Sequence, residues 1–238
     1  MMMTIGAMSK NAYLTFKISQ TNSSFANISN QTSSLFPSTN FFGSNNTNNT
    51  MLQHALSNQL AQQKDTIAKL EEYNKTSDKF YTDFFPNMDN LKSSSKALKD
   101  TDFSSNKTTD IVDSVKQFAN DYNSALNFLN DNSKTSNKIA NLATSFSATK
   151  YNRNSLESIG INVDSKGQLS VDETKLASAL TTDANKVSQI LGNKGLSNQT
   201  LSKVTYAVSS STDLIPFPKI SNQAANGLMQ GILLDLYA

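Results

Sequence analysis

The chain has no cysteine, one histidine and one arginine. The absence of cysteine excludes disulfides, thiolate chemistry and cysteine-ligated zinc. A single imidazole cannot form a histidine-based metal site, so we expect His54 to lie at the surface or in an interface rather than in a catalytic centre. Arg153 alone cannot form the arginine cluster that recognises phosphates. We therefore predict no enzyme activity, no cofactor and no metal site.

Long apolar runs are also lacking. No run approaches the roughly 20 residues of a membrane span, so we predict none. Residues 1–18 lack a basic region followed by a continuous apolar core, and we expect no cleaved signal peptide. If the protein leaves the cell, it must use a route that does not need such a peptide. The net charge of +2 is too small to favour nucleic acid or an anionic membrane surface as a partner.

What the chain does contain is polar. Only 37% of the residues are hydrophobic and 17% are charged, so serine, threonine and asparagine supply much of the rest and the interior must be thin. We expect a mainly α fold, an elongated helical bundle or coiled coil with polar connectors. Residues 1–50 are of low complexity and are predicted to be flexible. Residues 51–208 form the predicted helical domain, and residues 209–238 form an apolar C-terminal segment.

The first predicted helix begins near Met51 and carries a heptad seam. Polar Gln63 and Asn74 interrupt this seam and are expected to fix its register. Pro86 is predicted to break the helix. The spacing is compatible both with an ordinary core-facing stripe and with self-association. The apolar seam residues proposed as an interface are Leu56, Leu60, Ile67 and Leu70.

The second predicted helix spans about residues 110–130 and has a stronger apolar stripe, which must be covered. Thr109 or Asp110 is expected to cap its N-terminus. Residues 130–136 then interrupt the pattern, and a third helical segment begins near Ile139. The stripe of the second helix completes the set of predicted interface residues: Ile111, Val115, Phe118, Tyr122, Leu126 and Leu129.

A compact unit is predicted over residues 158–192. It begins with a β-hairpin, in which Ile161 and Val163 alternate on one strand and Leu169 and Val171 on the other. The intervening residues 164–167 have turn chemistry, with Gly167 at the position that needs a positive φ.

Two short helices follow the hairpin. Asp172 is expected to cap the first, and Thr182 or Asp183 the second. Gly192 is placed to end the second helix. A calcium loop is disfavoured because Asp164 and its neighbours depart from the EF-hand spacing, and a turn explains them better.

The order of these elements resembles the C-terminal region of flagellar hook-associated protein 2, the filament-capping family. The resemblance covers about residues 110–208. It is weaker over residues 51–102, and the β domains that the family carries between its N-terminal helix and this region look absent. The motifs that carry the resemblance are Tyr122–Asn123, Ile159–Gly160–Ile161, Asp164–Gly167, Leu169–Asp172 and Lys175–Leu176.

This resemblance implies a structural protein of the bacterial flagellum, outside the cell and exported without a cleaved signal peptide. It implies association with copies of itself and with flagellin or other axial proteins, and an export chaperone as a further partner. A second hypothesis is a secreted helical binding module or surface adhesin derived from the same family.

Overall fold

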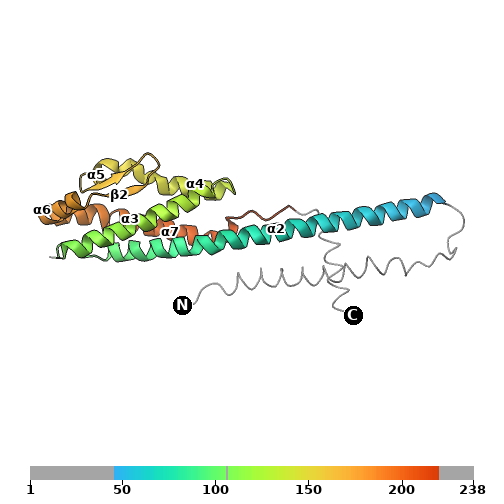
Figure 1. Ribbon diagram of the computed structural model, residues 1–238, viewed down its shortest axis with the longest axis horizontal. Coiled ribbons are helices and arrows are strands. Elements are labelled where there is room, and N and C mark those ends of the chain that lie inside the picture. Colours follow the sequence, from blue (N-terminus) through green and yellow to red (C-terminus); the bar gives the residue numbers. More distant parts are fainter. Residues whose placement is uncertain (1–45, 106, 220–238) are drawn as a thin grey trace, which may run out of the picture. The chain divides into compact units, whose positions relative to one another are not determined.

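The computed structural model describes residues 46–105 and 107–219 (Figure 1). The chain divides into two compact units. Unit 1 comprises Met1–Asp78 and Phe217–Ala238, and unit 2 comprises Lys79–Pro216. The flexible segment and the apolar C-terminal segment that the sequence predicts lie largely outside the described residues. The predicted division into three segments therefore stays a prediction.

Helix α2 (Asn46–Lys99) begins before the predicted start at Met51. In unit 1 its polar surface is interrupted by the buried residues Thr66 and Ile67. The ring of Phe217 lies edge-on against Tyr73, with 5.1 Å between the ring centroids. Aromatic pairs at this separation are favourable, so this contact attaches the chain after unit 2 to α2.

Pro86 lies inside α2, and the prediction that it breaks the helix is wrong. Proline lacks the N–H that would bond the carbonyl one turn earlier. Its ring is exposed, whereas Phe84 and Met88 beside it are fully buried. Phe80 and Phe84 stack at 5.5 Å and also contact Phe128 of the next helix at 5.2 and 6.2 Å. Burial of this aromatic face holds the helix through the proline.

Unit 2 is mainly helical with one small sheet, which confirms the predicted fold class. A short loop after Lys99 leads directly to α3 (Thr108–Asp131). Figure 1 shows α3 lying along the end of α2, and the hairpin and α6 lie over α3. The remaining elements are α4 (Asn137–Ser147), η1 (Ala148–Asn152), α5 (Arg153–Glu157), β1 (Ile161–Val163), β2 (Leu169–Val171), α6 (Glu173–Leu191), α7 (Leu196–Ser209) and η2 (Ser211–Asp213).

The N-terminus of α3 differs from the prediction. Lys107 occupies the N-cap position, and no side chain caps the helix there, so neither Thr109 nor Asp110 is the cap. Asp110 lies in the first turn instead, where a carboxylate interacts favourably with the helix dipole. At the next helix the Ser136 hydroxyl accepts a hydrogen bond from Ile139 N, and this cap fixes the start of α4 after the predicted interruption.

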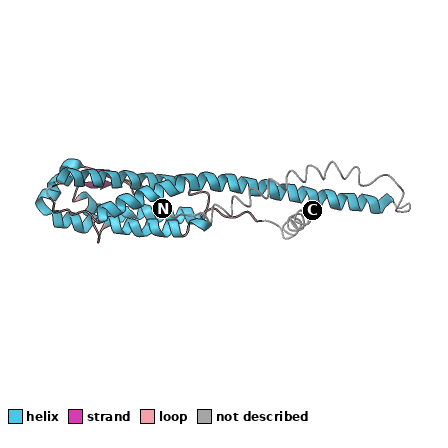
Figure 2. Cartoon of the chain, turned by 90° about the horizontal axis from the view of Figure 1, so that it is seen from below, coloured by secondary structure: helices cyan, strands magenta, loops and turns pink. Residues whose placement is uncertain are grey.

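The predicted hairpin is present. β1 and β2 pair antiparallel, with Ile161 opposite Val171 and Val163 opposite Leu169. Figure 2 shows this small sheet among the helices of the described chain. Because two strands alone are marginally stable, the sheet depends on the helices beside it.

Both of the predicted caps are present, one before α6 and one inside it. Asp172 accepts from Lys175 N at 3.0 Å, and Asp183 accepts from Lys186 N at 3.0 Å. Asp183 has non-helical angles, so α6 is two short helices joined at a kink, with Asp183 rather than Thr182 as the second cap. Gly192 ends α6 as predicted. Among the described helices, none is both long and apolar enough to cross a membrane.

Candidate functional site

The motif residues of the hairpin–helix unit (residues 158–192) each have a structural task. In the turn, Asp164 Oδ1 accepts hydrogen bonds from the N–H groups of Lys166 and Gln168, both at 2.8 Å. Gly167 has φ +86, and a side chain there would press against the backbone of Ser147. This confirms the predicted turn and explains why Asp164 and Gly167 occur together.

Asn123 of α3 binds the outer edge of β2. Its side-chain amide donates to Leu169 O at 2.7 Å and accepts from Leu169 N at 2.8 Å. The amide thus satisfies both edge groups of one strand residue, as another strand would. The sequence motif drew attention to Asn123, but its spacing gave no sign of this bond across 46 residues.

Tyr122, the neighbour of Asn123, ties α3 to α4 and η1. Its hydroxyl donates to Phe146 O and lies 2.7 Å from Thr149 Oγ1. The phenol is buried, and burial raises the pKa of Tyr122 to about 12, against the opposing effect of the Thr149 hydrogen bond. Tyr122 and Asn123 therefore fasten three elements to one turn of α3.

Gly160 explains the Ile–Gly–Ile motif. Its φ is +91, and its carbonyl accepts from Asp172 N at 2.8 Å. A Cβ at this position would lie 2.7 Å from Leu176 N, closer than side chains tolerate. Only glycine permits this approach of the strand entrance to the start of α6.

The predicted interface residues of α3 lie in the core of unit 2. None is more than 3% exposed, and three are fully buried. They pack against elements of the same chain, because α3 contacts α4, β2 and α6. In this structure they are therefore not available to another subunit. These residues are Ile111, Val115, Phe118, Tyr122, Leu126 and Leu129.

The predicted interface residues of α2 are in unit 1 and are covered unequally. Leu60 is 37% exposed, Ile67 is buried and Leu70 is half-buried. Leu56 is in the helix, but its side chain lies outside the described residues. Of the seam residues whose side chains are described, Leu60 is thus the most accessible.

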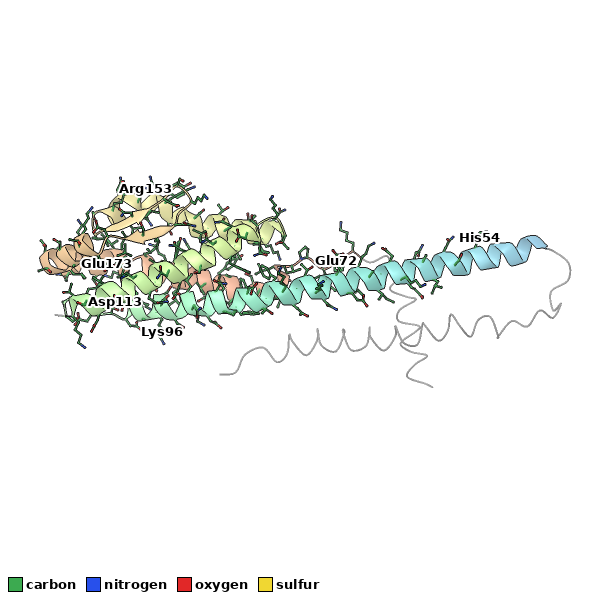
Figure 3. All side chains as sticks on the ribbon, in the orientation of Figure 1. His54, Glu72, Lys96, Asp113, Arg153 and Glu173 are labelled. Carbon is green, nitrogen blue, oxygen red and sulfur yellow. The ribbon has the colours of Figure 1, made fainter. Side chains whose placement is uncertain are left out.

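Charged side chains are dispersed over the described residues. Figure 3 shows Asp113 on α3 and Glu173 on α6, and Glu173 forms an ion pair of 2.7 Å with Lys116. This pair raises the pKa of Lys116, chiefly through the hydrogen bond to Glu173. His54 is exposed on α2 (Figure 3). Among the described residues, no group of three or more histidine, aspartate or glutamate side chains is placed to hold a metal ion.

A groove of about 400 Å³ lies between α4 and α7, and the sequence gave no indication of it. Leu142 and Lys138 of α4 and Lys203 and Tyr206 of α7 line it, together with Leu214. Lys138 forms an ion pair with Asp213 at 3.1 Å. Burial lowers the pKa of Lys203, whose ammonium donates to Ser145 O at 2.8 Å. The groove therefore combines apolar and cationic side chains.

The fold defines a helical module in which the hairpin–helix unit is fixed to α3. The Asn123 side chain of α3 makes this connection through its hydrogen bonds to the backbone of Leu169. Residues 135–230 match the family model described as the flagellar hook-associated protein 2 C-terminus, so this part of the chain is similar to that family. No curated protein and no solved structure matches the chain significantly.

The family match confirms the predicted resemblance. It includes the hairpin–helix unit and α7, whereas α3, which carries Tyr122 and Asn123, precedes it. The match is to the C-terminal part of the family alone. This is consistent with the predicted reduced form, since only a short loop separates α2 from α3.

Proposed function

We propose that the chain is a structural component of the bacterial flagellum that resembles the filament cap, associates with itself and contacts flagellin or other axial subunits. The family match over residues 135–230 carries this proposal, and at the coarser level it indicates a cap-related structural role. The hairpin–helix unit, which lies in the matched region, supports it. Asp172 caps α6 in this unit, Gly160 lets the strand entrance approach Leu176, and Asn123 fixes the unit to α3.

The α2 seam is the surface that we propose for self-association. The α3 stripe is already covered within unit 2, so it does not offer an apolar face. Leu60, by contrast, is exposed on a largely polar helix face. Heptad seams bring helices together through apolar residues that their own chain leaves exposed. The proposal therefore assigns the self-contact to the part of α2 around Leu60.

The same family relationship supports a location outside the cell, on the flagellum. We propose export without a cleaved signal peptide, with an export chaperone as a further partner. We also propose that the role is structural rather than enzymatic, as the sparse reactive groups of the sequence led us to expect.

Sedimentation velocity of the full chain tests the self-contact. The protein should sediment as a species heavier than its 26.0 kDa monomer at high concentration. Leu60→Glu should shift the population toward the monomer, because it places a charge in the apolar seam. Gln62→Glu is the matched control, since Gln62 is exposed and lies on the other side of the helix. A monomer at every concentration contradicts self-association.

Cosedimentation with flagellin filaments tests the axial contact. The chain should pellet with filaments and saturate at a level set by filament ends rather than by filament mass. Shearing the same filaments into shorter pieces should raise the bound amount, since it creates more ends. Binding in proportion to total flagellin, or no binding, contradicts a cap-like contact.

A further inference from the structure

The groove between α4 and α7 contains a cation, Lys203, that has no carboxylate partner among the described residues. Lys203 is half-buried and lies over the Phe146 ring, with 5.8 Å from its Nζ to the ring centroid. Its hydrogen bond to Ser145 O uses one of the three N–H donors of the ammonium. Of the ion pairs among the described residues, none includes Lys203. Lys203 therefore retains donors for an anionic group.

Lys138, the other lysine of the groove, differs from Lys203 because it has a carboxylate partner. Lys138 is exposed and is paired with Asp213, so its charge is balanced within the chain. The groove therefore presents one available positive charge beside Leu142, Leu214 and the ring of Tyr206, which is 65% exposed. A partly desolvated ammonium beside apolar side chains is complementary to a carboxylate that lies among apolar residues. This chemistry describes an acidic, leucine-rich peptide segment.

The sequence itself contains such a segment. Residues 226–238 read NGLMQGILLDLYA, and Asp235 is the one charged residue in this stretch. Leucines flank it on both sides. Because the chain is proposed to associate with itself, we take a second copy as the source of this segment, and a contact within one copy is the alternative that the test below excludes.

We infer that the groove between α4 and α7 binds the leucine-rich segment around Asp235 of a second copy, with Lys203 pairing with that carboxylate. This inference rests on the proposed self-association and names a contact for it apart from the α2 seam. A contact between a groove and a segment is head-to-tail, so each copy offers one of each and a ring or a chain of copies results.

A charge exchange between separately purified proteins tests this contact. Lys203→Glu and Asp235→Lys, each in the full chain, should weaken self-association about tenfold or more by sedimentation, because each creates a like-charge pair. Mixing the two variants should restore association, since the altered groove then meets the altered segment. If Lys203→Glu unfolds, Lys203→Met, which keeps the aliphatic stem and lacks the charge, should by itself weaken self-association, and a Lys203→Met chain that associates like the unmodified chain contradicts the contact. Lys194→Glu, on an exposed lysine outside the groove lining, is the control.

The possible results separate this inference from the proposed function. Restoration by mixing supports the contact between copies, because a contact within one copy cannot be restored by a second variant. If the unmodified chain associates, but the single variants behave as it does or mixing restores nothing, the groove contact is overturned and self-association stands. If the unmodified chain stays monomeric, both the self-association and the groove contact are overturned.

Discussion

The seam of α2 in unit 1 and the stripe of α3 both repeat at intervals of three and four residues, yet their surroundings differ. On α3 the six stripe residues are all buried in unit 2. On α2, Leu60 is 37% exposed and Leu70 is half-buried. The spacing of apolar residues alone therefore does not decide whether a helix face meets its own core or remains accessible.

Composition beside the stripe accounts for the difference. On α3, Val112, Ala119 and Ala125 widen the stripe, and they are also buried, so the apolar face is broad enough to be covered by several elements. On α2 the seam includes the polar Gln63 and Asn74, which are half-buried. A narrow seam with polar positions is typical of a reversible helix contact rather than of a core.

The largest difference is expected when one leucine of each helix is truncated. Leu126→Ala should lower the free energy of unfolding by about 2–5 kcal/mol, because it leaves a cavity in a fully buried site. Leu60→Ala should change the stability of the monomer by no more than about 0.5 kcal/mol, since a partly exposed side chain leaves no cavity. Urea denaturation of both variants measures the two values.

Asn120→Ala is the control for α3, because Asn120 is exposed on the same helix. It should resemble the unmodified chain, apart from the small gain in helix propensity. Equal losses for Leu126→Ala and Leu60→Ala would remove the distinction between the two helices.

A smaller difference is expected for one amide of each helix. Asn123→Ala should cost about 1–3 kcal/mol, because it leaves the N–H and C=O of Leu169 without their partner at a partly buried strand edge. Gln63→Ala should stay within about 0.5 kcal/mol. Thermal unfolding gives both values, and hydrogen exchange at Leu169 should accelerate in Asn123→Ala alone.

Asn123→Asp sharpens this test. A carboxylate still accepts from Leu169 N, but it has no N–H to donate to Leu169 O. The unfolding free energy of Asn123→Asp should therefore lie between that of the unmodified chain and that of Asn123→Ala. If Asn123→Ala has no effect on stability, the bond across α3 and β2 does not hold the hairpin in place.

Much of the hairpin–helix unit could be predicted, because its signals are local. The turn of Asp164 and Gly167 and the caps Asp172 and Asp183 each depend on residues a few positions apart. Local patterns also failed where a wider environment decided the result. Pro86 is a strong local helix breaker, but the buried aromatic face of Phe80 and Phe84 holds α2 through it.

The candidate surfaces were less predictable because they depend on tertiary contacts. The stripe of α3 was visible, but whether Leu126 meets its own chain or another depends on where α4, β2 and α6 fold back. The groove brings together Lys138 and Lys203, which are 65 positions apart in the sequence. No periodicity relates them, so their proximity appears only in the folded chain.

The smallest effect at neutral pH is expected for Tyr122→Phe, with a loss of about 1 kcal/mol for the hydrogen bonds to Phe146 O and Thr149 Oγ1. Tyr206→Phe, on an exposed ring, should be close to neutral. Denaturation at pH 7 measures the unfolding free energy of both variants. The difference between them shows whether the buried hydroxyl of Tyr122 contributes more to stability than the exposed hydroxyl of Tyr206.

Alkaline pH narrows the difference in stability between the two variants and then reverses it, because only chains that keep Tyr122 lose stability through this group. Burial raises the pKa of Tyr122 from 10.0 to about 12, so the unfolded chain loses this proton first. The contribution of the neutral phenol is complete below pH 10, and it is lost as the pH rises toward 12. The unfolding free energy of the unmodified chain should fall more steeply than that of Tyr122→Phe, by up to about 1.4 kcal/mol per pH unit. Parallel curves for the two proteins would mean that the Tyr122 hydroxyl is not buried in the folded state.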